Sequence, residues 1–468
     1  MKELPEPLFA VYALSLPRGH GFGSRPPAGA WTTDDGASVG VLTRDDSNVF
    51  GVLVMRRRVD DVWTITDAAD GISDRDQAMR RIGEALVEGK AREPVPSGVP
   101  PRAALYDLGS RTASDVFGLL AAPTHHRAAW MLNQLYLALP RPDANWVSDC
   151  QTGNFHTRLW EAILLGAFRE QGHLVTQPQE SPDFRIENRR GDSAWVEAVT
   201  ANPSVPYNHF NAQEVAPPTE PMEVFAGAAA VRFAKTLGNK LLRRYDQLPH
   251  VKGQPFMIAL ADFHAAGSMK WSREALIGYL YGHGAEVVEV AGLKQPRSLP
   301  FTHLLGPSRF PAGLFANEAC AELSAVVFSN ACSIAKLNRV AITTFGAPAG
   351  LRYMRMGRFF DRAPGALEGR PFCMDIMSDE YRALWPGERE PWSAELEVFH
   401  NPFARHPAPR RLLPEATHWF MQDGEVVCAS HYPHQILWSQ SMILDADKPA
   451  PTLEDFLRRG AYIVQDDA

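Results

Sequence analysis

The chain has 468 residues, with 47 lysine and arginine residues against 54 aspartate and glutamate residues, giving a formal net charge of −7. Its hydrophobic content of 45% is typical of a globular protein, and the length predicts two or three domains. No run of about 18 apolar residues is present, so no transmembrane helix and no membrane partner is expected. The acidic balance lacks the basic footprint of many nucleic-acid-binding proteins, although local arginine clusters such as Arg189-Arg190 occur.

The five cysteines are odd in number and scattered along the chain. This usage is typical of a reducing compartment and predicts no disulfide framework. The first residues combine one lysine, an early acidic pair and a proline-interrupted apolar run, a pattern that does not match a signal peptide. We therefore expect a cytoplasmic protein.

Residues 1–110 are predicted to form a separate N-terminal α/β unit. Four segments alternate between apolar and polar residues as strands do, and residues 73–90 have the periodicity of an amphipathic helix. Nothing in this unit indicates catalysis, so recognition or assembly is the default expectation. The predicted strands are residues 8–16, 37–43, 49–56 and 62–66.

A helical connector is expected over residues 111–150. Its helical pattern covers residues 113–139 and is interrupted at Pro123. Residues 140–150 combine prolines with polar residues and are interpreted as the linker into the next domain.

The next segment predicts a helix that carries a carboxylate on or beside its buried face. Its apolar residues, among them Leu164 and Phe168, recur at helical spacing, and Gly172 marks the end. Glu161 precedes these two residues by three and seven positions and so lies near the same face. A buried carboxylate is costly unless it is paired or bound to a metal. A salt bridge at the rim of the helix is the alternative for Glu161.

Three strands are then expected, and two of them carry an acidic residue. Residues 173–177 form the first, and Pro182-Asp183 opens the second. Gly191 in the following turn suits a hairpin. In the third strand, alternation puts Glu197 on the same face as its apolar neighbours at two-residue spacing, Trp195 and Val199. An acidic residue in such a setting is unusual.

A long helix over residues 222–248 and a buried strand over residues 256–261 complete the predicted core. Further helical structure is expected over residues 271–282. Residues 324–329 and 339–344 are predicted as strands that extend the central sheet.

The order helix, three strands, helix, strand, with Pro182-Asp183 and Glu197 at these positions, resembles the PD-(D/E)XK nuclease superfamily. The resemblance covers roughly residues 150–265 and implies a restriction-endonuclease-like αβββαβ core. It implies that Asp183 and Glu197 bind a metal, Mg²⁺ or Mn²⁺, and that Glu161 corresponds to the acidic residue often found on the first helix. The expected architecture is α/β, with the nuclease-like domain at residues 151–345 and a C-terminal extension at residues 346–468.

One departure concerns the motif lysine, which the family places two residues after the glutamate. That position is Val199, which cannot orient water or stabilise a phosphoryl oxygen. Some members of the superfamily supply this lysine from the following helix, where Lys240 is the best candidate and Lys235 the second. The alternative for Lys240 is a surface lysine whose stem packs along apolar residues.

The leading hypothesis is therefore a metal-dependent endonuclease that hydrolyses DNA phosphodiester bonds, with Glu161, Asp183, Glu197 and Lys240 as catalytic residues. By family analogy it would act in bacterial defence or DNA processing. Two alternatives stay open: a catalytically silent nucleic-acid-binding or scaffold protein with the same fold, and an unrelated α/β protein whose acidic residues are structural. A homodimer or a partner protein is compatible with each.

Other chemistry has less support in the sequence. Cys428, His431 and His434 lie close together, and His418 could complete a zinc site, but the spacing around Pro433 favours a structural role. Nucleophile-elbow, phosphate-loop and dinucleotide-binding signatures are not found.

Overall fold

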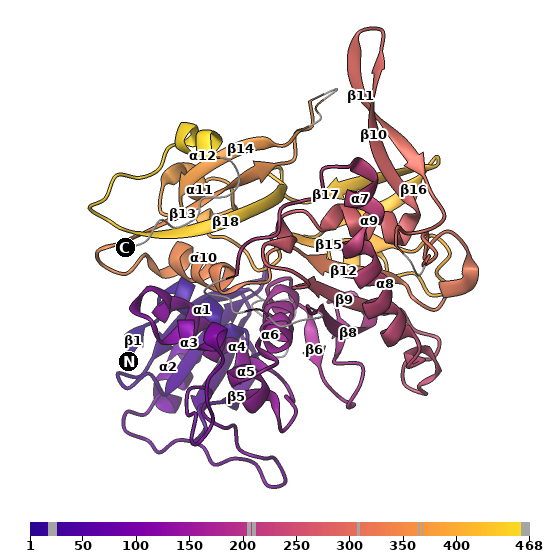
Figure 1. Cartoon of the computed structure of the whole chain (residues 1–468). Helices are drawn as coiled ribbons and strands as arrows, with labels where there is room; N and C mark the ends of the chain where they lie inside the picture. Colours follow the sequence, from indigo (N-terminus) through magenta and orange to yellow (C-terminus); the bar gives the residue numbers. More distant parts are fainter. Residues whose placement is uncertain are drawn as a thin grey trace.

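The computed structural model of the chain describes residues 1–16, 26–203, 207, 212–306, 309–363, 366 and 368–459. Within these residues the fold is mixed α/β, as the sequence predicts, and the strands form sheets of eight, five, three and two strands. Figure 1 shows the two-stranded hairpin projecting from the body of the molecule. None of the helices in the described residues is long and apolar enough to cross a membrane.

The first 72 residues supply an antiparallel five-stranded sheet with a hydrophobic core on each face. Helix α1 (Glu6–Ala13) packs on one face and helix α2 (Arg75–Ala85) on the other. The side chain of Asp74 accepts a hydrogen bond from the backbone of Asp76 and so caps α2. The strands are β1 (Lys2–Glu3), β2 (Pro27–Thr32), β3 (Ser38–Arg44), β4 (Phe50–Arg57) and β5 (Trp63–Ile72).

The prediction of a strand over residues 8–16 is wrong, because this segment begins in helix α1. Pro7 lies in the first turn of the helix, where a missing N–H group costs no hydrogen bond. Phe9 and Ala13 are four residues apart and both bury in the core against the sheet. A short apolar segment fits this one-sided burial equally well as a helix or a strand, so its pattern alone does not decide between them.

The connector over residues 111–150 contains helical structure beyond residue 139, where its helical pattern was predicted to end. Residues 140–150 do not form a plain linker, because helix α5 begins within them and Trp146 is only 1% exposed. Trp146 stacks on Tyr136 with ring centroids 4.7 Å apart. The α-helices of the connector are α3 (Asp115–Gly118), α4 (His126–Ala138) and α5 (Trp146–Gln151).

The eight-stranded sheet has the order β17-β16-β15-β12-β9-β8-β7-β6. Neighbours among β6, β7 and β8 are antiparallel, whereas β8, β9 and β12 run parallel to one another. Beyond them, β15 is antiparallel to β12, β16 is parallel to β15, and β17 is antiparallel to β16. The strands are β6 (Leu174–Thr176), β7 (Phe184–Glu187), β8 (Ser193–Ala201), β9 (Phe256–Asp262), β12 (Ala325–Ser329), β15 (Leu396–His400), β16 (Thr417–Gln422) and β17 (Glu425–Ser430).

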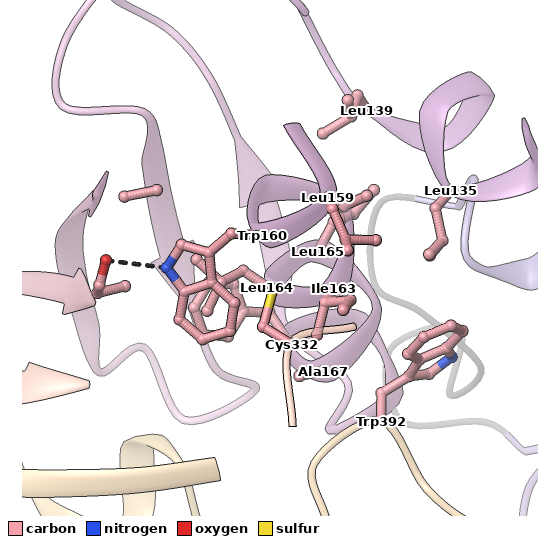
Figure 2. Close-up of a cluster of buried hydrophobic side chains, with 14 of the residues drawn as sticks. Leu135, Leu139, Leu159, Trp160, Ile163, Leu164, Leu165, Ala167, Cys332 and Trp392 are labelled. Carbon is pink, nitrogen blue, oxygen red and sulfur yellow. Dashed lines mark hydrogen bonds between the residues drawn. The ribbon is translucent and has the colours of Figure 1, made fainter. Parts of the chain in front are cut away.

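Helices cover both faces of this sheet, and its central strands are accordingly largely apolar. Helix α6 (Phe155–Glu170) packs on one face, and helices α8 (Ala228–Leu241) and α9 (Arg273–Tyr281) pack on the other. Figure 2 shows the core around α6, where the indole of Trp160 donates a hydrogen bond to the carbonyl of Ala259 at 2.9 Å.

The long helix predicted over residues 222–248 is broken into α7 (Pro221–Ala226) and α8. The break lies at Gly227, where a Cβ atom would approach the carbonyl oxygen of Glu223 to 2.3 Å. Helix α8 ends at Leu241, and a single 3₁₀ turn follows at Tyr245–Gln247.

The strand predicted over residues 339–344 is also wrong, because these residues lie in helix α10 (Ile334–Phe345). The hydroxyl of Ser333 caps this helix by accepting a hydrogen bond from the backbone of Lys336. Leu337 and Ala341, one turn apart, are both fully buried.

Residues 346–468 contribute to two sheets. Strands β15, β16 and β17 extend the eight-stranded sheet, so the boundary predicted at residue 345 does not coincide with a sheet boundary. The remaining elements are β13 (Leu351–Phe359), β14 (Arg370–Asp375), β18 (Ile436–Asp445), α11 (Asp379–Arg382) and α12 (Leu453–Arg459), with the earlier hairpin formed by β10 (His283–Val290) and β11 (Leu293–Pro300).

Candidate active site

Two of the predicted carboxylates lie close to each other along paired strands, Asp183 directly before β7 and Glu197 within β8. Strands β7 and β8 pair so that Phe184 lies opposite Val196, and both side chains bury in the core on the α6 face. Asp183 comes directly before Phe184, outside β7, and Glu197 follows Val196 on β8. Because side chains alternate along a strand, Glu197 projects toward the α8 face with Trp195 and Val199, and the Asp183 carboxylate contacts the backbone of the next β8 residue, Ala198.

Glu197 is buried, and its two carboxylate oxygens have different surroundings. Oε1 accepts hydrogen bonds from Lys240 Nζ at 2.5 Å and from the hydroxyl of Tyr245 at 2.7 Å. Oε2 is buried and has no hydrogen-bond partner among the described residues. A buried carboxylate oxygen without a partner is costly, so it marks a position where a cation or a donor would be stabilised.

Asp183 is also held through one oxygen. Its Oδ2 accepts a hydrogen bond from the backbone N–H of Ala198 at 2.7 Å. Burial and then the negative charges of Glu197 and Glu161 raise the pKa of Asp183 well above its usual range, against the lowering effects of the Ala198 N–H and of Lys240. Glu161 and Glu197 therefore both act electrostatically on Asp183, and we call Glu161, Asp183 and Glu197 the carboxylate cluster.

Glu161 reaches the cluster from α6 and is the most fully partnered of the three. Its Oε2 accepts a hydrogen bond from the indole of Trp146 at 2.8 Å, and its Oε1 accepts one from Arg158 at 2.9 Å. Burial raises the pKa of Glu161 to about 7 in spite of both donors. Arg158 also forms ion pairs with Asp143 and Asp149, so its positive charge is shared. The salt bridge considered for Glu161 is present, although the residue is buried and not at the rim.

The structure separates the two lysine candidates. Lys240 lies in the last turn of α8 with its side chain 18% exposed and its ammonium on Glu197. Lys235 is exposed, and its ammonium lies 5.7 Å from the centroid of the Phe310 ring. Val199, at the position of the motif lysine, buries in the core on the α8 face. Of the two lysines, Lys240 is the one in contact with the carboxylate cluster.

Tyr245 was not singled out from the sequence as a site residue. In a continuous helix over residues 222–248 it would belong to the apolar stripe. The helix ends at Leu241 instead, and Arg244 adopts the left-handed conformation with φ 52°. This reversal directs the Tyr245 hydroxyl to Glu197, and no glycine or proline in the sequence signals it.

The residues present fit a hard divalent cation. No group of three or more His, Cys, Asp and Glu side chains in the described part of the chain forms a ready-made metal site. Mg²⁺, however, is commonly held by one or two carboxylates together with water and substrate phosphate. Asp183 and the unpartnered Oε2 of Glu197 supply that donor set.

The cysteine and histidine residues considered for zinc do not form such a group within the described residues. The ring of His418 bonds to His400 at 2.8 Å and to the carbonyl of Leu413 at 3.0 Å. Burial lowers the pKa of both histidines to about 4. Both ring nitrogens of His418 thus have hydrogen-bond partners within the fold.

None of the protein-family models, curated proteins or solved structures with which the chain was compared matches it.

Proposed function

We propose that the protein is a metal-dependent endonuclease of the PD-(D/E)XK type that hydrolyses phosphodiester bonds in DNA. The observation that carries the proposal is the contact of Lys240 with Glu197, whose charges both act on Asp183, with one buried oxygen of Glu197 left without a partner among the described residues. The order of elements α6, β6, β7, β8, α8 and β9 supports it, because the restriction-endonuclease-like core has the same order.

Asp183 and Glu197 would hold the metal, Mg²⁺ or Mn²⁺, through the oxygens that the Ala198 N–H and Lys240 leave open. When bound, such an ion lowers the pKa of water and offsets the charge that develops on the phosphoryl group. Glu161 would support this centre from the α6 side. Its bonds to Trp146 and Arg158 fix the orientation of its carboxylate.

Lys240 would act at the phosphoryl group. Its ammonium has three donors, and the contact with Glu197 uses one of them. The others can orient the attacking water or donate to a phosphoryl oxygen, which is how a fixed positive charge lowers the barrier to hydrolysis. The lysine would thus come from α8 and not from the position of Val199.

A second candidate function is a nucleic-acid-binding or scaffold protein that keeps this fold without catalysis. The buried Val199 at the motif position favours it, as does the salt bridge that already occupies Glu161. Bacterial defence or DNA processing, in the cytoplasm, remains an inference by analogy for either candidate.

The test is a cleavage assay on the full chain. Supercoiled plasmid and labelled DNA and RNA oligonucleotides, single- and double-stranded, are incubated with Mg²⁺, with Mn²⁺ or with EDTA. The nuclease proposal expects cleavage of DNA that EDTA and the Asp183→Asn substitution both abolish. Binding without cleavage under every condition would support the silent binder, and neither binding nor cleavage would leave the third reading, an unrelated α/β protein.

A further inference from the structure

The chain reversal after α8 brings a second basic residue to the candidate site. The backbone N–H of Arg243 donates to the carbonyl of Lys240 at 3.1 Å, and that of Arg244 donates to Leu241 at 3.0 Å. These bonds wind the chain for one more turn before Arg244 reverses it. Arg243 lies between Lys240 and Tyr245 in the sequence, and both of these residues contact Glu197.

The guanidinium of Arg243 lies at the edge of the carboxylate cluster and is exposed. One of its nitrogens, Nη1, lies 3.4 Å from the Tyr245 hydroxyl. The hydrogen bond to Tyr245 is the main cause of a raised pKa for Arg243, and the charges of Glu197 and Asp183 contribute to the same rise. An arginine whose pKa responds to both proposed metal ligands lies within electrostatic reach of the site.

Among the described residues Arg243 has no ion pair, in contrast to three other arginines around the site. Arg158 is paired with Asp149, Arg185 with Glu187 and Arg244 with Asp246. No carboxylate oxygen of the described residues lies within ion-pair distance of Arg243. Its guanidinium is therefore both exposed and available to an anion from solution.

We propose that Arg243 binds a backbone phosphate of the nucleic acid, next to the phosphate that is cleaved. This role rests on the proposed nuclease function. A guanidinium offers paired N–H donors that match the geometry of phosphate oxygens. Contacts of this kind position the backbone without reading the base, so the contribution is the same for every sequence.

The structure offers a matched control in the adjacent residue. An arginine at the C-terminal end of a helix is also stabilised by the helix dipole, which needs no ligand. Arg244 shares that location and is exposed, but Asp246 already pairs with it at 2.8 Å. Arg243→Gln and Arg244→Gln each remove one positive charge, so their general effect on an anionic ligand is equal.

The experiment measures binding of full-length protein to a labelled duplex and to the corresponding single strand at several salt concentrations. Ca²⁺ replaces Mg²⁺ so that the substrate is not consumed, and kcat and KM are then measured with Mg²⁺. Arg243→Gln is expected to weaken binding about tenfold, as the loss of one charged hydrogen bond does. It should raise KM with little change in kcat. Arg244→Gln is expected to leave both values near those of the wild type.

The salt dependence adds a readout that a structural role would not change. The slope of the logarithm of the binding constant against the logarithm of salt concentration is negative, and loss of one phosphate contact makes it less negative by about 0.9 for duplex and about 0.7 for single strand. Equal effects of the two substitutions, or a wild-type slope in Arg243→Gln, would overturn the role of Arg243 while the wild type still cleaves. A wild type that neither binds nor cleaves nucleic acid would overturn the nuclease function itself, and this role with it.

Discussion

This protein has two groups of buried residues that each combine carboxylates with lysine or arginine, but the pKa of a central carboxylate is raised in one group and lowered in the other. In the carboxylate cluster, burial and neighbouring carboxylates raise the pKa of Asp183. In the second group, burial alone would raise the pKa of Glu390, but the charges of Arg339, Lys336 and Arg355 lower it well below its usual range. We call this second group the ion-pair network; it consists of Lys336, Arg339, Arg355, Glu390 and Glu395.

The difference lies in the number of cations available to each group. The network joins α10 to β13 and to the segment before β15, and its three cations surround two carboxylates. The carboxylate cluster has Lys240 and Arg158 for three carboxylates, and Arg158 is shared with Asp143 and Asp149. A buried network whose cations outnumber its carboxylates is structural, whereas a deficit of positive charge beside an unpartnered oxygen is what a cation-binding site requires.

Breaking the network is expected to have the largest effect on stability. Glu390→Gln leaves three buried cations with one carboxylate, which should lower the free energy of unfolding by about 3–5 kcal/mol. Urea unfolding followed by tryptophan fluorescence measures it. Glu388→Gln is the matched control, because Glu388 is two-thirds exposed (67%) and pairs with Arg382 at the surface. An unchanged midpoint for Glu390→Gln would remove the contrast between the two groups.

Neutralising one carboxylate of the carboxylate cluster should raise the stability of the metal-free protein, whereas the same kind of substitution in the ion-pair network lowers it. Without metal, Asp183→Asn removes a carboxylate that its neighbours repel and keeps an oxygen for the Ala198 N–H, so the melting temperature in EDTA should rise. Saturating Mg²⁺ should stabilise the wild type by about 2.7 kcal/mol at a hundred times its Kd, and the variant much less. Equal Mg²⁺ stabilisation of wild type and variant would contradict metal binding by Asp183.

The raised pKa of Glu161 predicts that the stability of the folded protein depends on pH. Its pKa is raised from 4.5 to about 7 in the folded state, so the folded protein binds more protons than the unfolded chain between these values. Stability from this group is therefore present at low pH and is lost by about 1–3 kcal/mol as the pH rises through 4.5 to 7. Glu161→Gln should flatten that part of the curve of melting temperature against pH in EDTA. A curve identical to the wild type would reject the raised pKa.

A smaller effect is expected for Tyr245, which holds Glu197 without touching substrate. Tyr245→Phe removes the hydroxyl on Oε1 and should lower kcat about threefold to tenfold, with KM little changed, because one hydrogen bond is worth about 1 kcal/mol. Tyr106→Phe is the control, since its hydroxyl bonds to the carbonyl of Ala129 elsewhere in the fold. A change confined to KM would mean that Tyr245 contacts the substrate.

Sequence patterns predicted which residues of this region lie near one another better than they predicted the contacts between them. Alternation along β8 correctly put Trp195 and Val199 on one face, and helical periodicity pointed to Lys240 as the lysine on α8. The metal ligands and the role of Lys240 stay predictions. Patterns cannot show the turn that brings Tyr245 back to Glu197, because Arg244 adopts a left-handed conformation that its residue type does not favour.

Sequence patterns also cannot predict contacts between residues that are far apart in the chain. The ion-pair network joins Lys336 to Glu390, and Glu161 depends on the indole of Trp146, from a segment interpreted as a linker. The segments at residues 8–16 and 339–344 are short and apolar, and tertiary packing made both of them helical. Element type was thus predictable where a pattern was long, and less so where burial alone decides.

The most direct test of the central claim compares Lys240 with the other lysine of the same helix. The rate of Mg²⁺-dependent DNA cleavage is measured for the wild type, Lys240→Ala and Lys235→Ala. Lys240→Ala should lower kcat at least about a hundredfold while the fold is retained, because it removes the fixed charge at the phosphoryl group. Lys235→Ala should cleave like the wild type. Full cleavage by Lys240→Ala would contradict the proposed site.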